Sequence, residues 1–341
     1  MKVSVVISAR NEEKYLPECL ASLDAQDYPH DKLEIILVDS ASEDGTRRIM
    51  EEFARRTDME VKILENPRGD TPRGLNTGFK AATGDAVLLL IGHSFIPPNH
   101  ISRAVRLLQE KNADGVCGRI VTIGSGQNTI WDAAIAAAME SPLGIGNATA
   151  RVGGKPGWID NPMLTLYRRS LFERFGYIDE RLTRNQDYEF NQRCYAGGAK
   201  FWFQPDMPVY YHNRPTLRAL WRQYFNGARW RAFMVGEHQR AVMPRHLVPP
   251  LFVLTLLISV ILAVIQPRFL PLPAAIVGIY LGALLGAALA AAVSRKRPGL
   301  IFTMPLAIMT IHFAYGFGFL RGLFEFVIAG GRKKVIAAER Q

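Results

Sequence analysis

The chain has 341 residues with a formal net charge of +10, and 48% of its residues are hydrophobic. This length allows one large or two ordinary domains, and the basic residues form no long tract of the kind that binds nucleic acid. They gather at 214–245, 295–297 and 332–334 beside apolar stretches, which favours an anionic membrane surface as partner over an ordinary solvated basic surface.

The three cysteines are scattered without the spacing of a metal site, so we expect reduced core residues in a domain that faces the cytosol. The first three residues lead directly into a strand pattern, and we therefore expect no signal peptide. Internal repeats and low-complexity segments are absent from the sequence.

The N-terminal part of the chain alternates short apolar runs with helical patterns. We predict strands at 3–8, 33–38, 60–65 and 86–91, separated by helices at 11–25, 47–56 and 73–82. Elements that alternate at this spacing form right-handed βαβ units and a parallel sheet. The last of these strands is entirely apolar, which is typical of the middle of such a sheet. Ligands bind beyond the carboxyl ends of such strands, so we expect the functional site there.

The pattern is less regular in the next part of the chain. We predict helices at 99–111, 131–140, 170–175 and 185–196, strands at 114–122, 163–168, 200–204 and 209–212, and a mobile loop at 144–157. A further helix at 216–234 mixes aromatic with basic residues. Such a helix either lies in a membrane interface or packs on the sheet as an ordinary amphipathic helix.

The C-terminal part contains three stretches, at 247–265, 270–293 and 299–320, without any Asp, Glu, Lys or Arg. About 20 helical residues span a hydrocarbon core of roughly 30 Å, so each stretch is long enough to cross a membrane. Three crossings would place the basic run 332–334 on the side opposite to 295–297, against the positive-inside rule. We therefore expect two to three spans, and the third stretch either crosses, re-enters or stops near the interface. The predicted parts are an α/β domain at 1–213, an interfacial helix region at 214–245, a membrane domain at 246–324 and a basic tail at 325–341.

Five motifs in the first two-thirds of the chain occur in a recognisable order. They are VSVVISARNEEKYLPECLASL at 3–23, VDSASEDGT at 38–46, LNTGFKAATGD at 75–85, YRRSLFERFGYIDE at 167–180 and NQDYEFNQR at 185–193. With them, residues 1–235 resemble the family 2 glycosyltransferases. The resemblance implies the GT-A fold, a Rossmann-like α/β domain with a mostly parallel sheet and flanking helices. RALWRQYFNGARW at 218–230 and HFAYGFGFLRGL at 312–323 are most similar to membrane-bound, succinoglycan-type glucosyltransferases.

The donor site is expected at the ends of the early strands. Asp39 follows a strand and suits the ring N–H of uracil, and the resemblance assigns it that role. Arg73 matches a family position near the nucleotide and would contact the diphosphate by bidentate hydrogen bonds, unless it is a solvated residue of the first helical turn. Asp44 is interpreted as a helix N-cap rather than a ligand. The resemblance places Ser8, Ala9 and Arg10 beside the base, and the other residues predicted to bind the donor are Glu12, Asn76, Gly92 and His93.

Asp187 is the candidate catalytic residue. Displacing a nucleoside diphosphate from an anomeric carbon needs a base for the acceptor hydroxyl proton, and a carboxylate at a helix start contributes about 10²–10⁴-fold in such a role. The family has an acidic residue followed by Asp here, whereas this chain has Gln186-Asp187. The alternative is that Asp187 only caps its helix. The residues expected on the acceptor or product side are Asp160, Gln186, Gln223, Arg229 and Trp230.

The strand at 86–91 ends differently from the family pattern of two aspartates around one residue. Succinoglycan-type members resemble Asp-Ala-His, and this chain has Ile91-Gly92-His93. His93 would then be a ligand of a divalent ion, with Mn²⁺ accepting nitrogen more readily than Mg²⁺, or it would hydrogen-bond the diphosphate directly. His212 is either a second ligand or an ordinary residue at a strand end.

The sequence therefore predicts an inverting glycosyltransferase. It would transfer a sugar from a nucleotide sugar, such as UDP-glucose or another UDP-hexose, to a lipid-linked saccharide in polysaccharide or glycolipid biosynthesis. We expect a multi-pass protein of the inner (plasma) membrane with its catalytic domain in the cytoplasm and no nucleic-acid partner. A non-catalytic, membrane-anchored binding module is one alternative, favoured by the missing aspartate. A polysaccharide synthase is another, although two or three helices are too few to line a channel.

Overall fold

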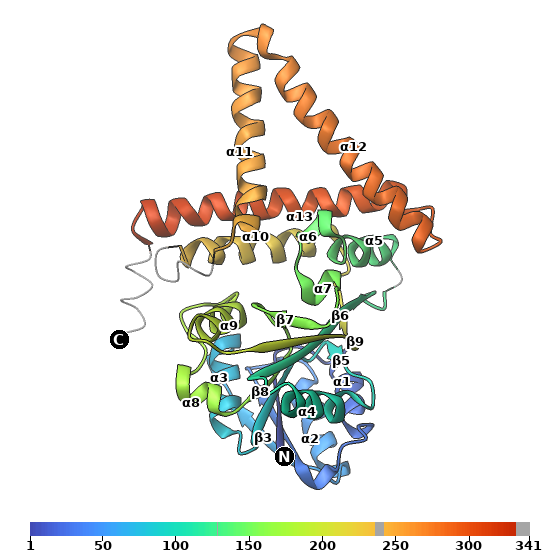
Figure 1. Ribbon diagram of the computed structural model, residues 1–341, viewed down its shortest axis with the longest axis vertical. Helices are drawn as coiled ribbons and strands as arrows, with labels where there is room; N and C mark the ends of the chain where they lie inside the picture. The colour runs from blue at the N-terminus through green and yellow to red at the C-terminus, as the bar shows by residue number, and fades with distance from the viewer. Residues whose placement is uncertain (128, 236–241, 332–341) are drawn as a thin grey trace. The chain divides into compact units, whose positions relative to one another are not determined.

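The computed structural model describes residues 1–127, 129–235 and 242–331 (Figure 1). Contacts divide the chain into two compact units, which alternate along the sequence. The first comprises Met1–Val121 and Thr149–Tyr211, and the second comprises Thr122–Ala148 and His212–Gln341. The division at 211/212 lies close to the boundary expected after residue 213. Residues 122–148 are grouped with the C-terminal helices rather than with the α/β domain.

The first unit is organised around four parallel strands in the order β3-β2-β1-β4. The strands are β1 (Val3–Ala9), β2 (Leu33–Asp39), β3 (Glu60–Glu65) and β4 (Ala86–Leu90). The helices between and after them are α1 (Leu16–Asp24), α2 (Thr46–Arg56), α3 (Thr71–Ala81) and α4 (His100–Glu110). The register pairs Ala9 with Asp39 and Asp39 with Glu65, so the carboxyl ends meet at one edge.

Beyond β4 the sheet is antiparallel. The strands are β8 (Leu166–Arg168), β6 (Gly115–Ile123), β9 (Phe201–His212), β5 (Ser94–Phe95) and β7 (Gly157–Ile159). The predicted α/β class is confirmed, with the sheet parallel only through its first four strands. The two strands predicted at 200–204 and 209–212 form the single strand β9, in which the alternation of buried and more exposed side chains is interrupted at Pro205 and resumes from Met207.

Two local predictions were wrong. The first helix begins at Leu16 rather than near Asn11, which has a left-handed φ of 56° and whose Oδ1 accepts a hydrogen bond from Glu43 N at 2.8 Å. Asn11 therefore joins the loop after β1 to the loop after β2 instead of capping a helix. The predicted loop at 144–157 contains two short helices, α6 (Pro142–Ile145) and α7 (Thr149–Val152).

Asp44 does hold the start of α2, because its Oδ1 accepts from Thr46 N at 3.0 Å. The helices α8 (Ser170–Phe175) and α9 (Gln186–Ala196) lie where they were predicted.

Glu34 is a fully buried carboxylate near the start of the otherwise largely apolar strand β2. It accepts hydrogen bonds from Ser4 Oγ, from Lys62 Nζ, and from Thr83 N and Oγ1 at 2.9 Å each. Burial alone would raise its pKa, but the bonds from Lys62, Ser4 and Thr83 outweigh burial and lower the pKa to about 2. One carboxylate thus connects β2 with β1, β3 and the turn before β4.

We predict that Glu34→Gln destabilises the first unit by about 3 kcal/mol, because the depressed pKa measures the stability that the charged form supplies. The folded pKa is below the ordinary value of 4.5, so this contribution is complete above that pH and is lost as pH falls toward 2. Unfolding in detergent at several pH values tests this, and the variant should lose less stability on acidification than the parent. Glu52→Gln is the control, because Glu52 is an exposed partner of Arg48 and should change stability by under about 1 kcal/mol.

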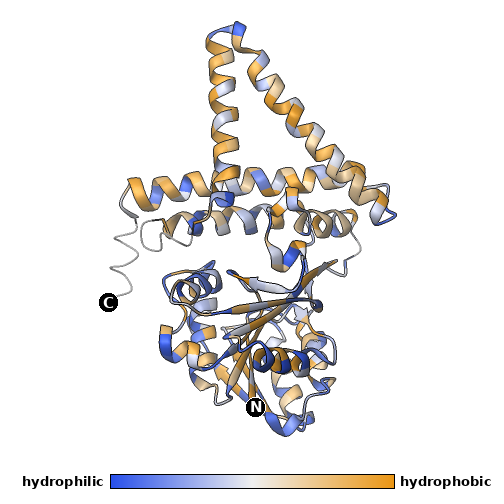
Figure 2. Cartoon of the chain, viewed as in Figure 1, coloured by the Kyte–Doolittle hydropathy of each residue, from blue (hydrophilic) through white to orange (hydrophobic). Residues whose placement is uncertain are grey.

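The second unit is helical. Its main helices are α5 (Ile130–Met139), α10 (Leu217–Phe233), α11 (Pro244–Ile265), α12 (Pro271–Ser294) and α13 (Leu300–Gly322), followed by a π-helical turn at Leu323–Ile328. Among the described residues, three helices are long and apolar enough to cross a membrane, namely Pro244–Ile265, Pro267–Ser294 and Leu300–Ile328. Figure 2, which is coloured by hydropathy, shows that hydrophobic residues predominate along all three. The predicted membrane domain therefore consists of helices of suitable length and composition.

The third apolar helix differs from the other two in its packing. In Figure 1, α13 runs alongside α10 and crosswise to α11. A Cβ on Gly318 would lie 2.2 Å from the carbonyl oxygen of Phe225, and one on Gly322 would lie 2.3 Å from that of Arg229. Glycines four residues apart thus allow the two helix backbones to touch. For α13, 39% of the most apolar window is buried in the protein, against 17% for each of the other two helices.

Candidate active site

The loops that follow β1, β2 and β3 meet at the carboxyl edge of the sheet in the first unit. Ser8 Oγ lies 3.0 Å from Ser40 Oγ, and Arg10 Nη1 donates to the carbonyl oxygen of Gly69 at 3.0 Å. Asp39 is half-buried between these loops, where its Oδ1 accepts from Ser42 N at 3.2 Å. The sequence-predicted residues Ser8, Ala9, Arg10 and Asp39 are therefore brought together at one edge.

Glu12 and His93 form a close pair beside the end of β4. Glu12 Oε1 lies 2.7 Å from His93 Nδ1, and the side chains are only 18% and 14% exposed. A Cβ at position 92 would lie 3.0 Å from Glu12 Cγ, so any residue larger than glycine would crowd the Glu12 side chain. Because a carboxylate accepts the proton of Nδ1, the neutral ring carries its free lone pair on Nε2. This tautomer suits His93 as a metal ligand or as an acceptor.

Sequence reasoning missed two residues beyond His93. The Tyr211 and His93 rings pack edge-on, with their centres 5.1 Å apart. The Arg151 guanidinium lies 4.9 Å from the centre of the Tyr211 ring. Arg151 Nη1 is buried and has no hydrogen-bond partner among the residues that the structure describes. Arg151 stands in a glycine-rich segment without a clear pattern, and only the fold brings it to this row of side chains.

Few of the side chains present could ligate a divalent metal. Within the described ranges, no group of three or more His, Cys, Asp or Glu side chains could hold a metal ion. His212 Nδ1 contacts the carbonyl oxygen of Gly124 at 3.0 Å within the second unit. At the carboxyl edge of the parallel strands, the imidazole of His93 is oriented by Glu12. These residues fit only an ion that takes its other ligands from a bound diphosphate and from water.

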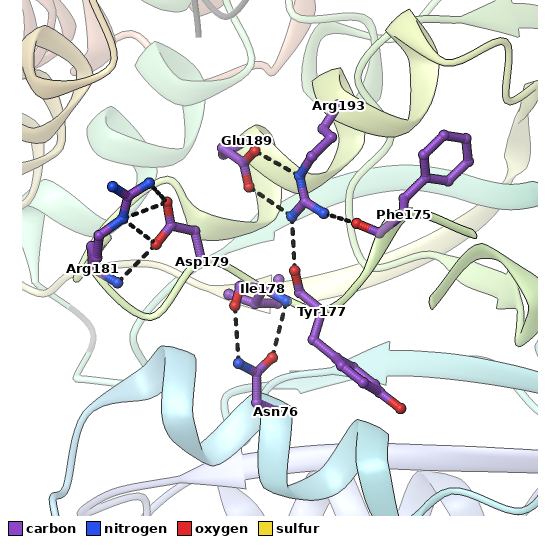
Figure 3. A network of polar contacts seen from close by, with 8 residues as sticks. All are labelled: Asn76, Phe175, Tyr177, Ile178, Asp179, Arg181, Glu189 and Arg193. Carbon is purple, nitrogen blue, oxygen red and sulfur yellow. Dashed lines mark hydrogen bonds and ion pairs between the residues drawn. The ribbon is translucent and has the colours of Figure 1, made fainter. Parts of the chain in front are cut away.

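Two residues predicted to bind the donor have partners within the first unit. Arg73 Nη1 pairs with Asp70 Oδ2 at 2.8 Å and Nε lies 3.4 Å from Glu180 Oε2, so it is not a freely solvated residue. Asn76 Nδ2 donates to the Ile178 carbonyl oxygen at 2.9 Å, and its Oδ1 accepts from Ile178 N at 3.0 Å (Figure 3). Asn76 Nδ2 also donates to Glu180 Oε1 at 2.8 Å. Both ends of the Asn76 amide are therefore used to hold α3 to the segment before α9, and we assign it no contact with the donor.

The same segment is also held from the other side by α9. Arg193 pairs with Glu189 at 2.8 Å and donates to the carbonyl oxygens of Phe175 and Tyr177, as Figure 3 shows. Arg193 thus neutralises Glu189 rather than Asp187. Asp187 lies half-buried in the first turn of α9, where its Oδ1 accepts from Tyr188 N at 2.8 Å.

The residues expected on the acceptor side belong to different units. Gln186 begins α9, and the carbonyl oxygen of Asp160 accepts from Gln192 Nε2 on the same helix at 2.9 Å, so both belong to the first unit and are associated with α9. The other three are on α10 in the second unit. Gln223 Oε1 accepts from Arg214 Nε at 3.2 Å, Arg229 pairs with both carboxylate oxygens of Glu325, and the Trp230 ring contacts the Phe326 ring at 5.3 Å. These contacts give Arg229 and Trp230 a packing role between α10 and the end of the chain's last described helix.

The comparison with family models decides which family this arrangement represents. The model described as Glycosyl transferase family 2 matches residues 4–176, just over half of the chain. The chain belongs to this family. The predicted enzyme class is therefore confirmed, and the family 2 glycosyltransferase fold accounts for the parallel half of the sheet with its carboxyl-edge residues.

Curated relatives and solved structures agree with this assignment. The chain is 27% identical to the succinoglycan biosynthesis protein ExoA of Rhizobium meliloti over 94% of this chain and 95% of the relative. It is 24% identical to a dolichyl N-acetyl-glucosaminyl phosphate glucuronosyltransferase of Methanococcus voltae, over 95% and 97% of the two chains. The mannosyltransferase PcManGT of Pyrobaculum calidifontis, solved with GDP-Man and Mn²⁺, is similar in fold with a TM-score of 0.59, 21% identity and coverage of 96% and 88%. TarS of Staphylococcus aureus, solved with UDP-GlcNAc, has a TM-score of 0.51, 19% identity and coverage of 92% and 90%.

Proposed function

We propose that this family 2 glycosyltransferase inverts the anomeric centre of a UDP-linked hexose and transfers it to a lipid-linked saccharide. The observation that carries the proposal is the meeting of Asp39 and the Glu12–His93 pair at the carboxyl edge of the parallel strands. In α/β sheets this edge is where nucleotides bind. Asp39 supplies the acceptor for a uracil N–H, and His93 Nε2 and the Arg151 guanidinium supply groups for the diphosphate.

Asp187 acts as the base in this proposal. The acceptor hydroxyl oxygen forms a bond to the anomeric carbon while the bond to the diphosphate breaks, and Asp187 takes the hydroxyl proton. A divalent ion, when bound, would neutralise charge on the leaving diphosphate. The half-buried position of Asp187 and the separate pairing of Arg193 with Glu189 support a carboxylate that is not neutralised by that neighbour.

We further propose that α11 and α12 are the two membrane spans and that α13 lies in the interface with α10. The crosswise course of α13 and its close backbone contact with α10 support this arrangement. Two spans return the chain to the side from which it entered, which removes the conflict with the positive-inside rule. The catalytic unit and the loop Arg295–Arg297 then share the cytoplasmic side of a plasma membrane. The names of the first two curated relatives, a succinoglycan biosynthesis protein and a dolichyl phosphate glycosyltransferase, support a lipid-linked acceptor.

A panel of donors tests the proposed function. Detergent-purified protein is incubated with UDP- and GDP-sugars, with and without a lipid extract, and nucleoside diphosphate release is measured. We expect lipid-dependent release of UDP from one UDP-hexose. Release from a GDP-sugar alone would overturn the uracil assignment, and the absence of lipid-dependent release from every donor would overturn the transfer itself.

Asp39→Ala is expected to weaken UDP binding by about 1–3 kcal/mol, or roughly 5- to 100-fold, because the uracil N–H loses its acceptor. The measurement is calorimetry with UDP and CDP on the same preparation. Asp39→Asn is the matched variant, since its amide can turn an N–H toward the cytosine ring and should narrow the preference for UDP over CDP. Unchanged UDP affinity in Asp39→Ala would mean that the base binds elsewhere.

A further inference from the structure

A cavity of about 650 Å³ lies entirely within the second unit, a volume typical of ligand sites. One wall comes from the end of β6 and the start of α5, and the other comes from the loop between α12 and α13. The residues that matter most in its lining are Thr122, Gly124, Thr129, Asp132, Arg295 and Arg297. The two arginines directly follow an apolar helix long enough to span a membrane, and the spans proposed above would place the cavity at a membrane surface.

The polar groups of the cavity suit an anion. Arg295 Nη2 pairs with Glu140 Oε2 at 3.0 Å, whereas Arg297 has no ion-pair partner among the residues for which the structure gives contacts. The carboxylate of Asp132 is occupied by Ser125 N at 2.9 Å and Thr129 N at 3.0 Å. Other donors thus occupy the carboxylate oxygens of Asp132 and Glu140, and the Arg297 guanidinium is available to bind a ligand.

Thr122 provides a second, independent indication of a ligand. Thr122 is one of the residues around the cavity and is only 5% exposed, and its buried Oγ1 has no hydrogen-bond partner within the described part of the chain. A buried hydroxyl without a partner costs free energy unless a bound group satisfies it. A hydroxyl and a guanidinium together match the oxygens of a phosphate group.

We propose that this cavity binds the phosphate group of the lipid that carries the acceptor saccharide. The inference rests on the proposed lipid-linked acceptor. A soluble phosphate could satisfy the same polar groups, but the position of the cavity between an apolar helix end and the apolar helix α5 favours a phosphate with a hydrocarbon chain. Binding of the carrier phosphate would hold the acceptor on the enzyme and so raise its effective concentration.

The test measures binding directly, with the full chain in nanodiscs of zwitterionic lipid that contain undecaprenyl phosphate or neutral undecaprenol. We expect binding of the phosphate only, weakened about ten-fold or more by Arg297→Ala and by Thr122→Val, while UDP affinity is unchanged. Arg268→Ala is the matched control, because Arg268 lies in the turn at the other end of α12 and should have no effect.

Three results would overturn the inference: equal binding of undecaprenol, no effect of Arg297→Ala, or Arg297-dependent binding of inorganic pyrophosphate in detergent without binding of the lipid phosphate. Sugar transfer on the same preparations separates this inference from the proposed function. Transfer to lipid that is indifferent to Arg297→Ala would refute the cavity alone. Arg297-dependent lipid binding without any transfer would refute the function and leave the cavity as a lipid-phosphate site.

Discussion

Asp187→Asn is expected to lower sugar transfer by about 10²–10⁴-fold while leaving the affinity for UDP unchanged. A neutral amide of the same shape keeps the hydrogen bond that Asp187 Oδ1 accepts from Tyr188 N, so the start of α9 should remain intact. The amide does not take up the proton of the acceptor hydroxyl, and the attack on the anomeric carbon then lacks its base. Turnover and UDP affinity should be measured on one preparation, together with thermal unfolding.

Glu189→Gln, two residues further along α9, is the matched control. Glu189 is buried and pairs with Arg193, which in turn holds the segment that packs on α3 (Figure 3). This variant should lose stability but retain turnover per folded molecule, whereas Asp187→Asn should show the reverse. Near-parental turnover in Asp187→Asn would refute its role as the base and leave it as a residue of the first helical turn.

His93→Ala is expected to abolish stimulation by Mn²⁺, if the ion is bound by this imidazole and by the donor diphosphate. With one protein ligand, the ion should bind weakly alone and tightly only when UDP is present, and Mn²⁺ should be more effective than Mg²⁺. Glu12→Gln keeps the size of the partner of His93 but weakens the bond to Nδ1, and it should reduce Mn²⁺ affinity by about 10- to 100-fold. Mn²⁺ binding is followed by electron paramagnetic resonance with and without UDP, next to initial rates.

Ile91→Asp extends this experiment, because it restores a carboxylate where the family pattern has one. It should raise the activity that Mg²⁺ supports, since a hard cation prefers oxygen ligands. If EDTA leaves the parent's activity unchanged, metal ligation by His93 is wrong. His93→Ala would then lower activity through a lost hydrogen bond to the diphosphate, independently of any added metal.

The sequence by itself determined the parts of this protein that repeat a local pattern. Strands such as 33–38 are recognisable because all their side chains except that of Glu34 are apolar, and helices such as 170–175 because their apolar residues recur with the helical period. Asp39 could be placed at the expected edge because it directly follows a strand. The apolar stretches near the C-terminus could be predicted as helices able to cross a membrane from their length and composition.

Only the tertiary structure decided the contacts between distant residues. Asn76 belongs to a family motif and lies in the middle of α3, but its amide pairs with Ile178, about a hundred positions away. Arg151 and Thr122 have no distinctive neighbours in sequence, and their importance depends on what surrounds them in space. The apolar composition of α13 permits a membrane span, yet Gly318 and Gly322 bring its backbone against α10. Composition and period encode how deeply an element is buried, whereas the partner against which it is buried depends on shape and on close backbone approach, which no local pattern specifies.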